Sequence, residues 1–284
     1  MNTRNYTITG HMVVKNEDRW IWYAIMSVID FVDIMYIYDT GSIDHTKEII
    51  NELVNRFAGK IIYEEFENVT PENFYKIRQK QLDATNTDYF MVVDGDEIWY
   101  QSALEELNKI LELNRPQLVA TRFVNCCGDV YHYRYNHRES YCINGIKGAI
   151  SVRVFSTSIP GIKCSGIYGI EGYVDKDEKP VQNNVYETKV MKGYFLHTSL
   201  LNRSSAANGD FSIRYRRAKL YADWDEKFDK SFCYPEVFYS KNNPRYVKSA
   251  FEKDINLLRM TIKSIIRIKS FIYCIYDKTR QIIK

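Results

Sequence analysis

The stretch Tyr89-Phe-Met-Val-Val-Asp-Gly-Asp-Glu97 joins an apolar run to an acidic turn. The apolar run predicts a buried β-strand, and Gly95 opens the turn that follows it. Asp94 and Asp96 offer hard oxygen donors, which suit Mg²⁺ or Mn²⁺ when substrate phosphates fill the remaining coordination positions. The stretch therefore predicts a cation site for a phosphorylated substrate. A solvated acidic turn is the alternative, since Asp and Gly favour turns for conformational reasons alone.

Strands and helices alternate on either side of this stretch. We expect strands at residues 7–14, 34–38, 60–66 and 89–93. Helical spacing of apolar residues marks 18–31. A second helix, capped by Ser42 or Asp44, runs through Phe57, and Pro71 starts a third where its missing N–H costs little. This order predicts a mostly parallel sheet covered by helices, with ligands bound beyond the carboxyl ends of its strands.

The pattern becomes rich in β-structure after the acidic turn. We expect a helix at 102–113, strands at 117–125, 130–135, 149–155 and 187–196, and helices from 211 onward. The predicted fold class is therefore α/β: a Rossmann-like, mostly parallel central sheet flanked by helices, with a mixed β extension and a C-terminal helical tail.

The composition is that of an ordinary globular protein. Of the 284 residues, 45% are hydrophobic and 26% are charged, and the net charge is +3. A charge this close to zero does not indicate a nucleic-acid partner. The six cysteines show no Cys-x-x-Cys spacing, and neither a signal peptide nor a membrane-spanning stretch of roughly 20 apolar residues is visible. We therefore expect a cytoplasmic location.

The C-terminal residues form a basic, amphipathic pattern. Residues 259–284 carry seven basic side chains and one acidic side chain, Asp277. Arg259, Lys263 and Arg267 recur every four residues beside a stripe of Leu and Ile. Such a helix could contact an anionic membrane surface as a peripheral anchor, or it could pack on the rest of the protein with its basic edge in water. Both interpretations stay open.

Four motifs occur in register along the chain. They are Val13-Val-Lys-Asn-Glu17, Tyr38-Asp-Thr-Gly-Ser-Ile-Asp-His-Thr46, Val93-Asp-Gly-Asp-Glu97 and Leu196-His-Thr-Ser199. Together they resemble the family 2 glycosyltransferases over roughly residues 7 to 220, most closely the branch of bacterial peptide and protein glycosyltransferases. The resemblance implies a GT-A fold and a nucleotide-sugar donor bound across the strand ends. It also implies transfer of the sugar with inversion at the anomeric carbon.

The same resemblance assigns roles to individual residues. It implies metal ligands at Asp96 and His197, donor-binding residues at Val14, Asn16, Glu17, Asp39, Arg78 and Asp94, and a catalytic base at Glu171. The assignment of Glu171 departs from the family pattern, because Ile170 stands where a His is expected before it. Asp175 and Asp129 are therefore fallback bases.

Each assignment has a structural alternative. A lone histidine such as His197 is usually structural, and Asp39 can serve as a turn or cap residue. Arg78 can be a solvated charge on a helix face, while Glu171 can decorate a flexible Gly loop. For Glu97, which could orient the metal site from behind, an ordinary turn carboxylate is an equal alternative.

The predicted function is a metal-dependent, inverting, hexosyltransferase-type glycosyltransferase. Its cofactor is Mn²⁺ or Mg²⁺, its preferred donor is a UDP-sugar, and its acceptor is a glycan, a lipid-linked saccharide or a protein. Residues 1–225 form the predicted catalytic domain. Within it, residues 1–100 form the half that binds the nucleotide-sugar and residues 101–225 the half that binds the acceptor. Residues 226–284 form a C-terminal helical segment with the basic amphipathic tail. A sugar nucleotidyltransferase is one alternative, although the first strand-end loop lacks the expected glycines. A non-catalytic carbohydrate-binding protein on the same scaffold is another.

Overall fold

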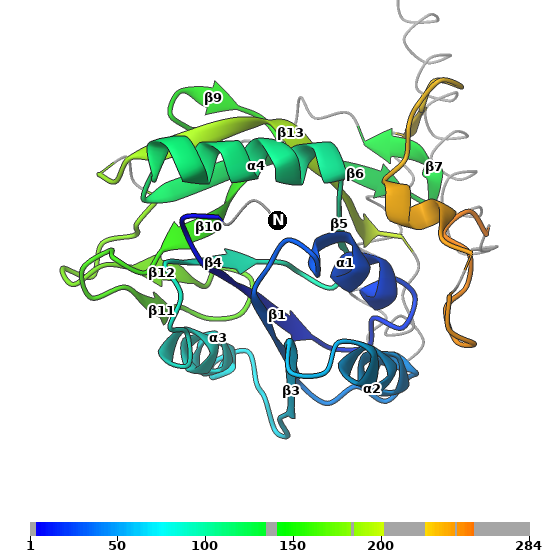
Figure 1. The fold of residues 1–284 in the computed structure, drawn as a ribbon, viewed down its shortest axis with the longest axis horizontal. Helices are drawn as coiled ribbons and strands as arrows, with labels where there is room; N and C mark the ends of the chain where they lie inside the picture. The colour runs from blue at the N-terminus through cyan, green and yellow to red at the C-terminus, as the bar shows by residue number, and fades with distance from the viewer. Residues whose placement is uncertain (1–3, 135–140, 183–184, 202–224, 242, 253–284) are drawn as a thin grey trace, which may run out of the picture.

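The structure is a computed structural model that describes residues 4–134, 141–182, 185–201, 225–241 and 243–252. In these ranges ten strands form one sheet, and helices cover both of its faces (Figure 1). No helix in the described ranges has the length and apolarity needed to cross a bilayer. The basic pattern at 259–284 lies outside the described residues, and so does most of the chain from 211 onward where helices are expected.

The first half of the chain forms the parallel part of the sheet. Its strands lie side by side in the order β4-β1-β2-β3, namely β1 (Ile8–Val14), β2 (Ile34–Asp39), β3 (Ile61–Glu65) and β4 (Tyr89–Val92). The connecting helices are α1 (Ile21–Val28), α2 (Thr46–Arg56) and α3 (Phe74–Asp83). All neighbouring pairs in this set are parallel. The predicted Rossmann-like half is therefore confirmed.

Strands β1 and β4 are buried along their whole length because helices cover both faces of this part of the sheet. In β1, Met12 and Val14 belong to the large core that also contains buried residues of α1 and α2. Val13, between them, belongs to a smaller cluster with Phe74 and Ile77 of α3. Alternate side chains of a strand point to opposite faces, so α1 and α2 cover one face and α3 covers the other. This arrangement leaves the carboxyl ends of β1, β2 and β4 to loops.

The second half adds the mixed extension. Its larger elements are β5 (Glu97–Trp99), α4 (Gln101–Asn114), β6 (Leu118–Cys127), β7 (Asp129–Arg134), β10 (Ile150–Ser156), β13 (Thr188–Leu200) and β14 (Asp225–Lys227). β10 runs antiparallel to both β4 and β6, which joins the two halves into one sheet. β13 runs parallel to β6 and antiparallel to β5. The predicted α/β fold class with its mixed β extension is confirmed.

Short elements complete the second half. Two small hairpins lie beside the main sheet, β8 (Cys142–Ile143) with β9 (Ile146–Lys147) and β11 (Lys163–Ser165) with β12 (Gly172–Val174). The strand β5 was not expected from the sequence, and its three residues are too few for a readable apolar pattern. Helix α3 begins at Phe74, three residues later than expected from Pro71, and the residues between form a turn in which the Asn73 amide oxygen accepts a hydrogen bond from Thr70 N–H at 2.8 Å.

The structure describes less than half of the segment 226–284, which was expected to be helical. In its described part, 226–241 and 243–252, the regular elements are the end of β14 and one short 3₁₀ helix, η3 (Glu236–Tyr239). β14 pairs antiparallel with β7 and so extends the main sheet. The expected domain boundary between 225 and 226 therefore falls inside a strand of that sheet.

Candidate active site

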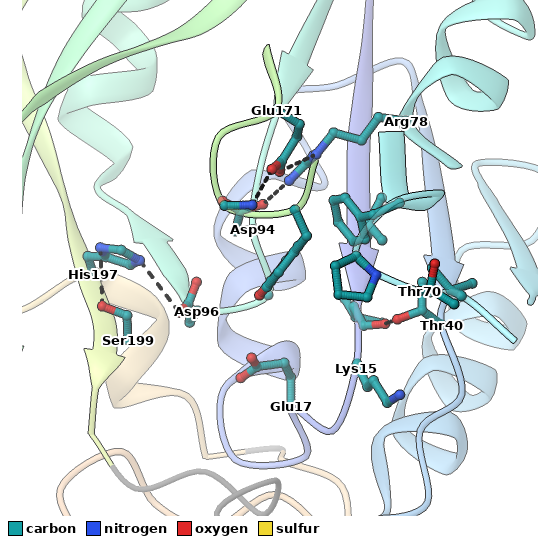
Figure 2. Close-up of a pocket in the computed structure, with 18 residues that line it drawn as sticks. Lys15, Glu17, Thr40, Thr70, Arg78, Asp94, Asp96, Glu171, His197 and Ser199 are labelled. Atoms are coloured by element: carbon teal, nitrogen blue, oxygen red, sulfur yellow. Dashed lines mark hydrogen bonds and ion pairs between the residues drawn. The ribbon is translucent and has the colours of Figure 1, made fainter. Parts of the chain in front are cut away.

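A pocket of about 580 Å³ lies at the carboxyl ends of β1, β2 and β4. Seven of the nine residues predicted for the site line it: Val14, Glu17, Arg78, Asp94, Asp96, Glu171 and His197. Figure 2 shows Asp96 and His197 on one side of the pocket and Arg78 and Glu171 on the other, with Asp94 between them. Ligand sites of open α/β sheets occur at this edge because the strand-end loops meet there.

The other two predicted donor-binding residues do not line the pocket. Asp39 is fully buried, and one of its carboxylate oxygens accepts hydrogen bonds from the N–H groups of Gly41 at 2.8 Å and Ser42 at 2.6 Å. Asn16 adopts a left-handed φ of 55°, and its amide oxygen accepts a hydrogen bond from Ile43 N–H at 2.8 Å. Both side chains therefore hold the loops that border the pocket in place. For Asp39 this is the turn role that the sequence allowed as an alternative to donor binding.

The loops after β1 and β2 are tied to each other. Ser42, one of two expected helix caps, accepts a hydrogen bond from Asn16 N–H at 2.8 Å, so it bridges the two loops. Asp44, the other, accepts one from Thr46 N–H at 3.0 Å at the start of α2. Thr40, which follows β2, lines the pocket and was not predicted.

The acidic turn packs closely against the first strand-end loop. A Cβ atom on Gly95 would lie 3.2 Å from Glu17 Cγ and 3.3 Å from Val14 Cγ1. The absence of a side chain at position 95 therefore lets the loop after β1 rest on the turn after β4. This contact places the Glu17 and Asp96 side chains along the same wall of the pocket.

Asp96 and His197 meet through strand pairing. In the antiparallel pair of β5 and β13, His197 lies opposite Glu97. The backbone N–H of Thr198 donates a hydrogen bond to the carbonyl oxygen of Asp96 at 2.8 Å. As a result His197 Nε2 lies 3.5 Å from Asp96 Oδ2, although about a hundred residues separate the two in the chain (Figure 2).

This pair suits a divalent cation. Burial lowers the pKa of His197, so its ring is neutral near pH 7 and can offer a lone pair. A carboxylate oxygen and an imidazole nitrogen are donors that Mn²⁺ accepts, and Mg²⁺ sites likewise rest on one or two protein carboxylates plus phosphates. The described ranges contain no group of three or more His, Cys, Asp or Glu side chains placed to hold an ion. Asp96 and His197 would therefore leave most coordination positions of an ion open to other ligands.

Two arginines connect two carboxylates that line the pocket, Asp94 and Glu171, with one that does not, Glu97. Arg78 Nη2 donates a hydrogen bond to Asp94 Oδ1 at 2.9 Å, and Arg78 Nε lies 3.6 Å from Glu171 Oε1. Arg153 forms an ion pair with the fully buried Glu97 and lies 3.5 Å from Asp94 Oδ2. Glu97 is thus part of this network rather than a surface turn carboxylate.

The network controls the protonation of its carboxyl groups. Burial by itself would raise the pKa of Asp94, but the nearby charges of Arg78 and Arg153 outweigh it and hold that pKa well below the usual range. Burial raises the pKa of Glu97 to about 7, against the opposing charge of Arg153. Arg153 had no predicted role, although a charged residue within the apolar strand β10 is a readable signal.

Glu171 lies on a loop that lines the pocket together with Tyr168 and Gly169. Gly169 N–H donates a hydrogen bond to Glu171 Oε2 at 2.5 Å. The same loop is attached to the segment before α3, since Tyr168 N–H donates to the Pro71 carbonyl at 2.9 Å and the Tyr168 ring packs edge-on against Phe74. The structure therefore places Glu171 at the pocket rather than on a free loop.

The fallback bases lie elsewhere. Asp175 accepts hydrogen bonds from Lys179 N–H and from the Tyr186 hydroxyl, within its own loop. Asp129 pairs with His132, at 2.6 Å between Oδ1 and Nδ1. Neither aspartate lines the pocket.

The chain was compared with known families and proteins. The sequence profile described as Glycosyl transferase family 2 matches residues 11–167. A TPR repeat-containing protein of Synechococcus elongatus is 28% identical over 109 residues, which are 38% of this chain and 25% of that protein.

Two solved structures show a partial likeness to this chain. The 1–349 fragment of S. aureus TarS in complex with UDP-GlcNAc is 13% identical, with a TM-score of 0.48 over 76% of this chain and 65% of that chain. Glucosyl-3-phosphoglycerate synthase from Mycobacterium tuberculosis, in complex with Mn²⁺, UDP-glucose and phosphoglyceric acid, is 22% identical. Its TM-score is 0.32, and the match covers 42% of this chain and 44% of that chain. The chain thus spans about two thirds of the TarS fragment and a quarter of the curated relative. The family match covers more than half of the sequence, and the chain therefore belongs to glycosyl transferase family 2.

Proposed function

We propose that this protein is a metal-dependent, inverting glycosyltransferase of the hexosyltransferase type. It transfers a sugar from a nucleotide-diphospho-sugar, with a UDP-sugar as the preferred donor, to a glycan, a lipid-linked saccharide or a protein. The observation that carries the proposal is the pairing of Asp96 with His197, at 3.5 Å, in a pocket that also contains Arg78 and Glu171. Membership of the family supports the use of a nucleotide-sugar.

Asp96 and His197 hold Mn²⁺ or Mg²⁺ in this proposal, through Oδ2 and Nε2. When bound, the ion neutralises negative charge that develops on the leaving diphosphate. Glu17 and Val14 border the donor on the β1 side, where the loop after β1 packs on Gly95. Asp39 and Asn16 act indirectly, by holding the loops through backbone hydrogen bonds.

Arg78 and Asp94 form the opposite part of the donor site. Their hydrogen bond fixes both side chains before a ligand arrives, so little ordering is needed on binding. The Asp94 carboxylate stays ionised because two arginines lower its pKa, and it can accept hydrogen bonds from ribose hydroxyls. Arg78 contributes positive charge on the donor side of the pocket.

Glu171 acts on the acceptor. Its carboxylate takes the proton from the acceptor hydroxyl while that oxygen forms a bond to the anomeric carbon and the bond to the diphosphate breaks. Attack from the face opposite the leaving group inverts the configuration at that carbon. Figure 2 shows Glu171 across the pocket from the Asp96–His197 pair, as this division of roles requires.

A thermal-shift experiment tests the proposal. UDP or GDP together with Mn²⁺ should raise the melting temperature, because a ligand that binds only the folded state stabilises it by mass action. Asp96→Ala should remove the part of the shift that depends on Mn²⁺. A nucleotidyltransferase would instead release pyrophosphate from a nucleoside triphosphate, and a carbohydrate-binding protein would respond to free saccharide and ignore nucleotide. The absence of any shift across a panel of nucleotides with Mn²⁺ would refute the enzymatic proposal.

Two further measurements define the reaction. Slow hydrolysis across a panel of nucleotide-sugars, in the absence of acceptor, should identify the base and the sugar of the donor. The anomeric configuration of the transferred sugar, read by NMR, then distinguishes inversion from retention.

A further inference from the structure

Asn125 of β6 lies directly beside the predicted metal-binding histidine. In the parallel pair of β6 and β13, Asn125 is the register partner of His197. Asn125 is buried, and its amide oxygen lies 3.0 Å from Nδ1 of the His197 ring. Asn125 has no part in the site as predicted from the sequence, and it does not line the pocket.

This contact determines which ring nitrogen carries the proton. An amide oxygen can only accept hydrogen bonds, so His197 Nδ1 must donate. The neutral ring is then protonated at Nδ1, and Nε2 keeps its lone pair. Nε2 is the atom that faces Asp96 Oδ2 at 3.5 Å. The Ser199 hydroxyl is a weaker second neighbour of Nδ1, at 3.4 Å.

The orientation of the ring is fixed by its other neighbours. Phe123 packs perpendicular to the His197 ring, with 5.5 Å between centroids, and Phe195 packs at 74° with 6.1 Å. These aromatic contacts hold the ring plane, but they do not distinguish nitrogen from carbon at the ring edge. Only a polar contact such as that from Asn125 can make that distinction.

We propose that Asn125 is a positioning residue that holds His197 in the Nδ1–H tautomer, so that Nε2 can bind the cation together with Asp96. The inference rests on the proposed function, since it concerns the metal site of that reaction. Ligating histidines generally donate their second ring N–H to an oxygen acceptor, which fixes the tautomer and raises the basicity of the ligand nitrogen.

In the alternative tautomer, Nε2 would carry the proton and could not bind a cation. With the proton on Nε2, the ring would donate toward Asp96 Oδ2, and the two atoms that should hold the ion would bond to each other. Asn125 prevents this arrangement because Nδ1 would then lack a proton to give to the amide oxygen. Loss of Asn125 should therefore weaken metal binding without removing any metal ligand.

Two variants isolate the effect in the full-length protein. Asn125→Leu keeps the branched shape of the side chain but removes the acceptor, whereas Asn125→Asp keeps an acceptor for Nδ1–H. The first readout is ¹⁵N NMR of the imidazole nitrogens without metal, with the His197 signals assigned by comparison with His197→Gln. The second is the Mn²⁺ affinity of the protein saturated with UDP, measured by electron paramagnetic resonance. UDP without protein, and Asp96→Ala with UDP, provide the background.

We expect an Nδ1–H tautomer for His197 in the unmodified protein and in Asn125→Asp, and its loss in Asn125→Leu. Mn²⁺ affinity should fall about 10- to 100-fold in Asn125→Leu and be retained in Asn125→Asp. An Nε2–H tautomer in the unmodified protein would overturn the inference without the need for any variant. Equal Mn²⁺ affinity of Asn125→Leu and the unmodified protein would overturn it too, as would an equal loss in both variants. If the unmodified protein bound no Mn²⁺ with UDP, the proposed function itself would fail.

Discussion

His11, in the middle of β1, should make the stability of the fold depend on pH. Its ring is fully buried and stacks on Phe90, with 4.8 Å between centroids. His11 Nε2 lies 2.7 Å from the Thr85 hydroxyl, which itself donates a hydrogen bond to the Gln81 carbonyl at 2.8 Å. The hydroxyl therefore accepts from Nε2–H, and Nδ1 is left as an acceptor without a hydrogen-bond partner in the described part of the chain.

Protonation of this ring would bury a charge and an unsatisfied Nδ1–H. Burial, reinforced by the charge of Arg78, lowers the pKa of His11 from 6.5 to about 3. Between these two values the unfolded chain binds a proton that the folded chain does not, so stability is complete above pH 6.5 and falls as the pH drops toward 3. At about 1.4 kcal/mol per pH unit, His11 should cost the fold about 2 kcal/mol between pH 7 and pH 5.

Urea unfolding at pH 7, 6 and 5 measures this effect against a matched variant. His11→Gln keeps an N–H for the Thr85 hydroxyl but cannot titrate. The carboxyl groups of the protein titrate in both forms, so the difference between their pH dependences isolates the ring. The unmodified protein should lose about 2 kcal/mol more than the variant between pH 7 and pH 5. If the free energy of unfolding fell equally with pH in both proteins, the reasoning would be refuted. An imidazole NMR signal of His11 in the folded protein that titrates above pH 5 would refute it too.

Three predictions concern the site itself. Asp96→Asn should lower kcat by about 10²- to 10³-fold and weaken the response to added Mn²⁺, and a kcat and a Mn²⁺ dependence equal to those of the unmodified protein would argue against its role as a ligand. Glu171→Gln should lower kcat by about 10²- to 10⁴-fold while UDP still shifts the melting temperature, and an unchanged kcat would exclude it as the base. Gly95→Ala should destabilise the fold by about 1–3 kcal/mol, because its Cβ would press on Glu17 Cγ at 3.2 Å. Gly172→Ala, whose Cβ would meet nothing within 4 Å, is the control in thermal denaturation. An equal loss of stability in the two variants would contradict the packing argument.

The order of the main elements could be predicted because each carries a local pattern. The runs of β1, β2 and β4 are mostly apolar, and the helices between them are long enough to show helical spacing. The short β5 could not be predicted, because a three-residue strand has no period of its own. It exists because β13 pairs with it, and that pairing is between segments about a hundred residues apart.

The acidic turn and the loops after β1 and β2 were predictable parts of the site because parallel strands end at one edge of a sheet. The direction of individual side chains was not. Asp39 stands at the end of β2 much as Asp94 stands just after β4, yet the Asp39 carboxylate points into its own loop and accepts hydrogen bonds from backbone N–H groups. The sequence Asp-Thr-Gly-Ser is the same whether the aspartate faces a ligand or a turn. Arg153 differs, since its charge within an apolar strand could have indicated a buried ion pair.

The chemistry of His197 depends on information that no local pattern contains. The residue type suggests a ligand, and the apolar run before it predicts a strand end, but neither says which ring nitrogen is protonated. That depends on the register between β13 and β6, which places Asn125 beside Nδ1 and leaves Nε2 toward Asp96. A shift of that register by one residue would move the amide oxygen to the other face of the sheet. The two proposed metal ligands could then form a hydrogen bond to each other, and for this reason the pairing of β6 with β13 belongs to the site as much as Asp96 and His197 do.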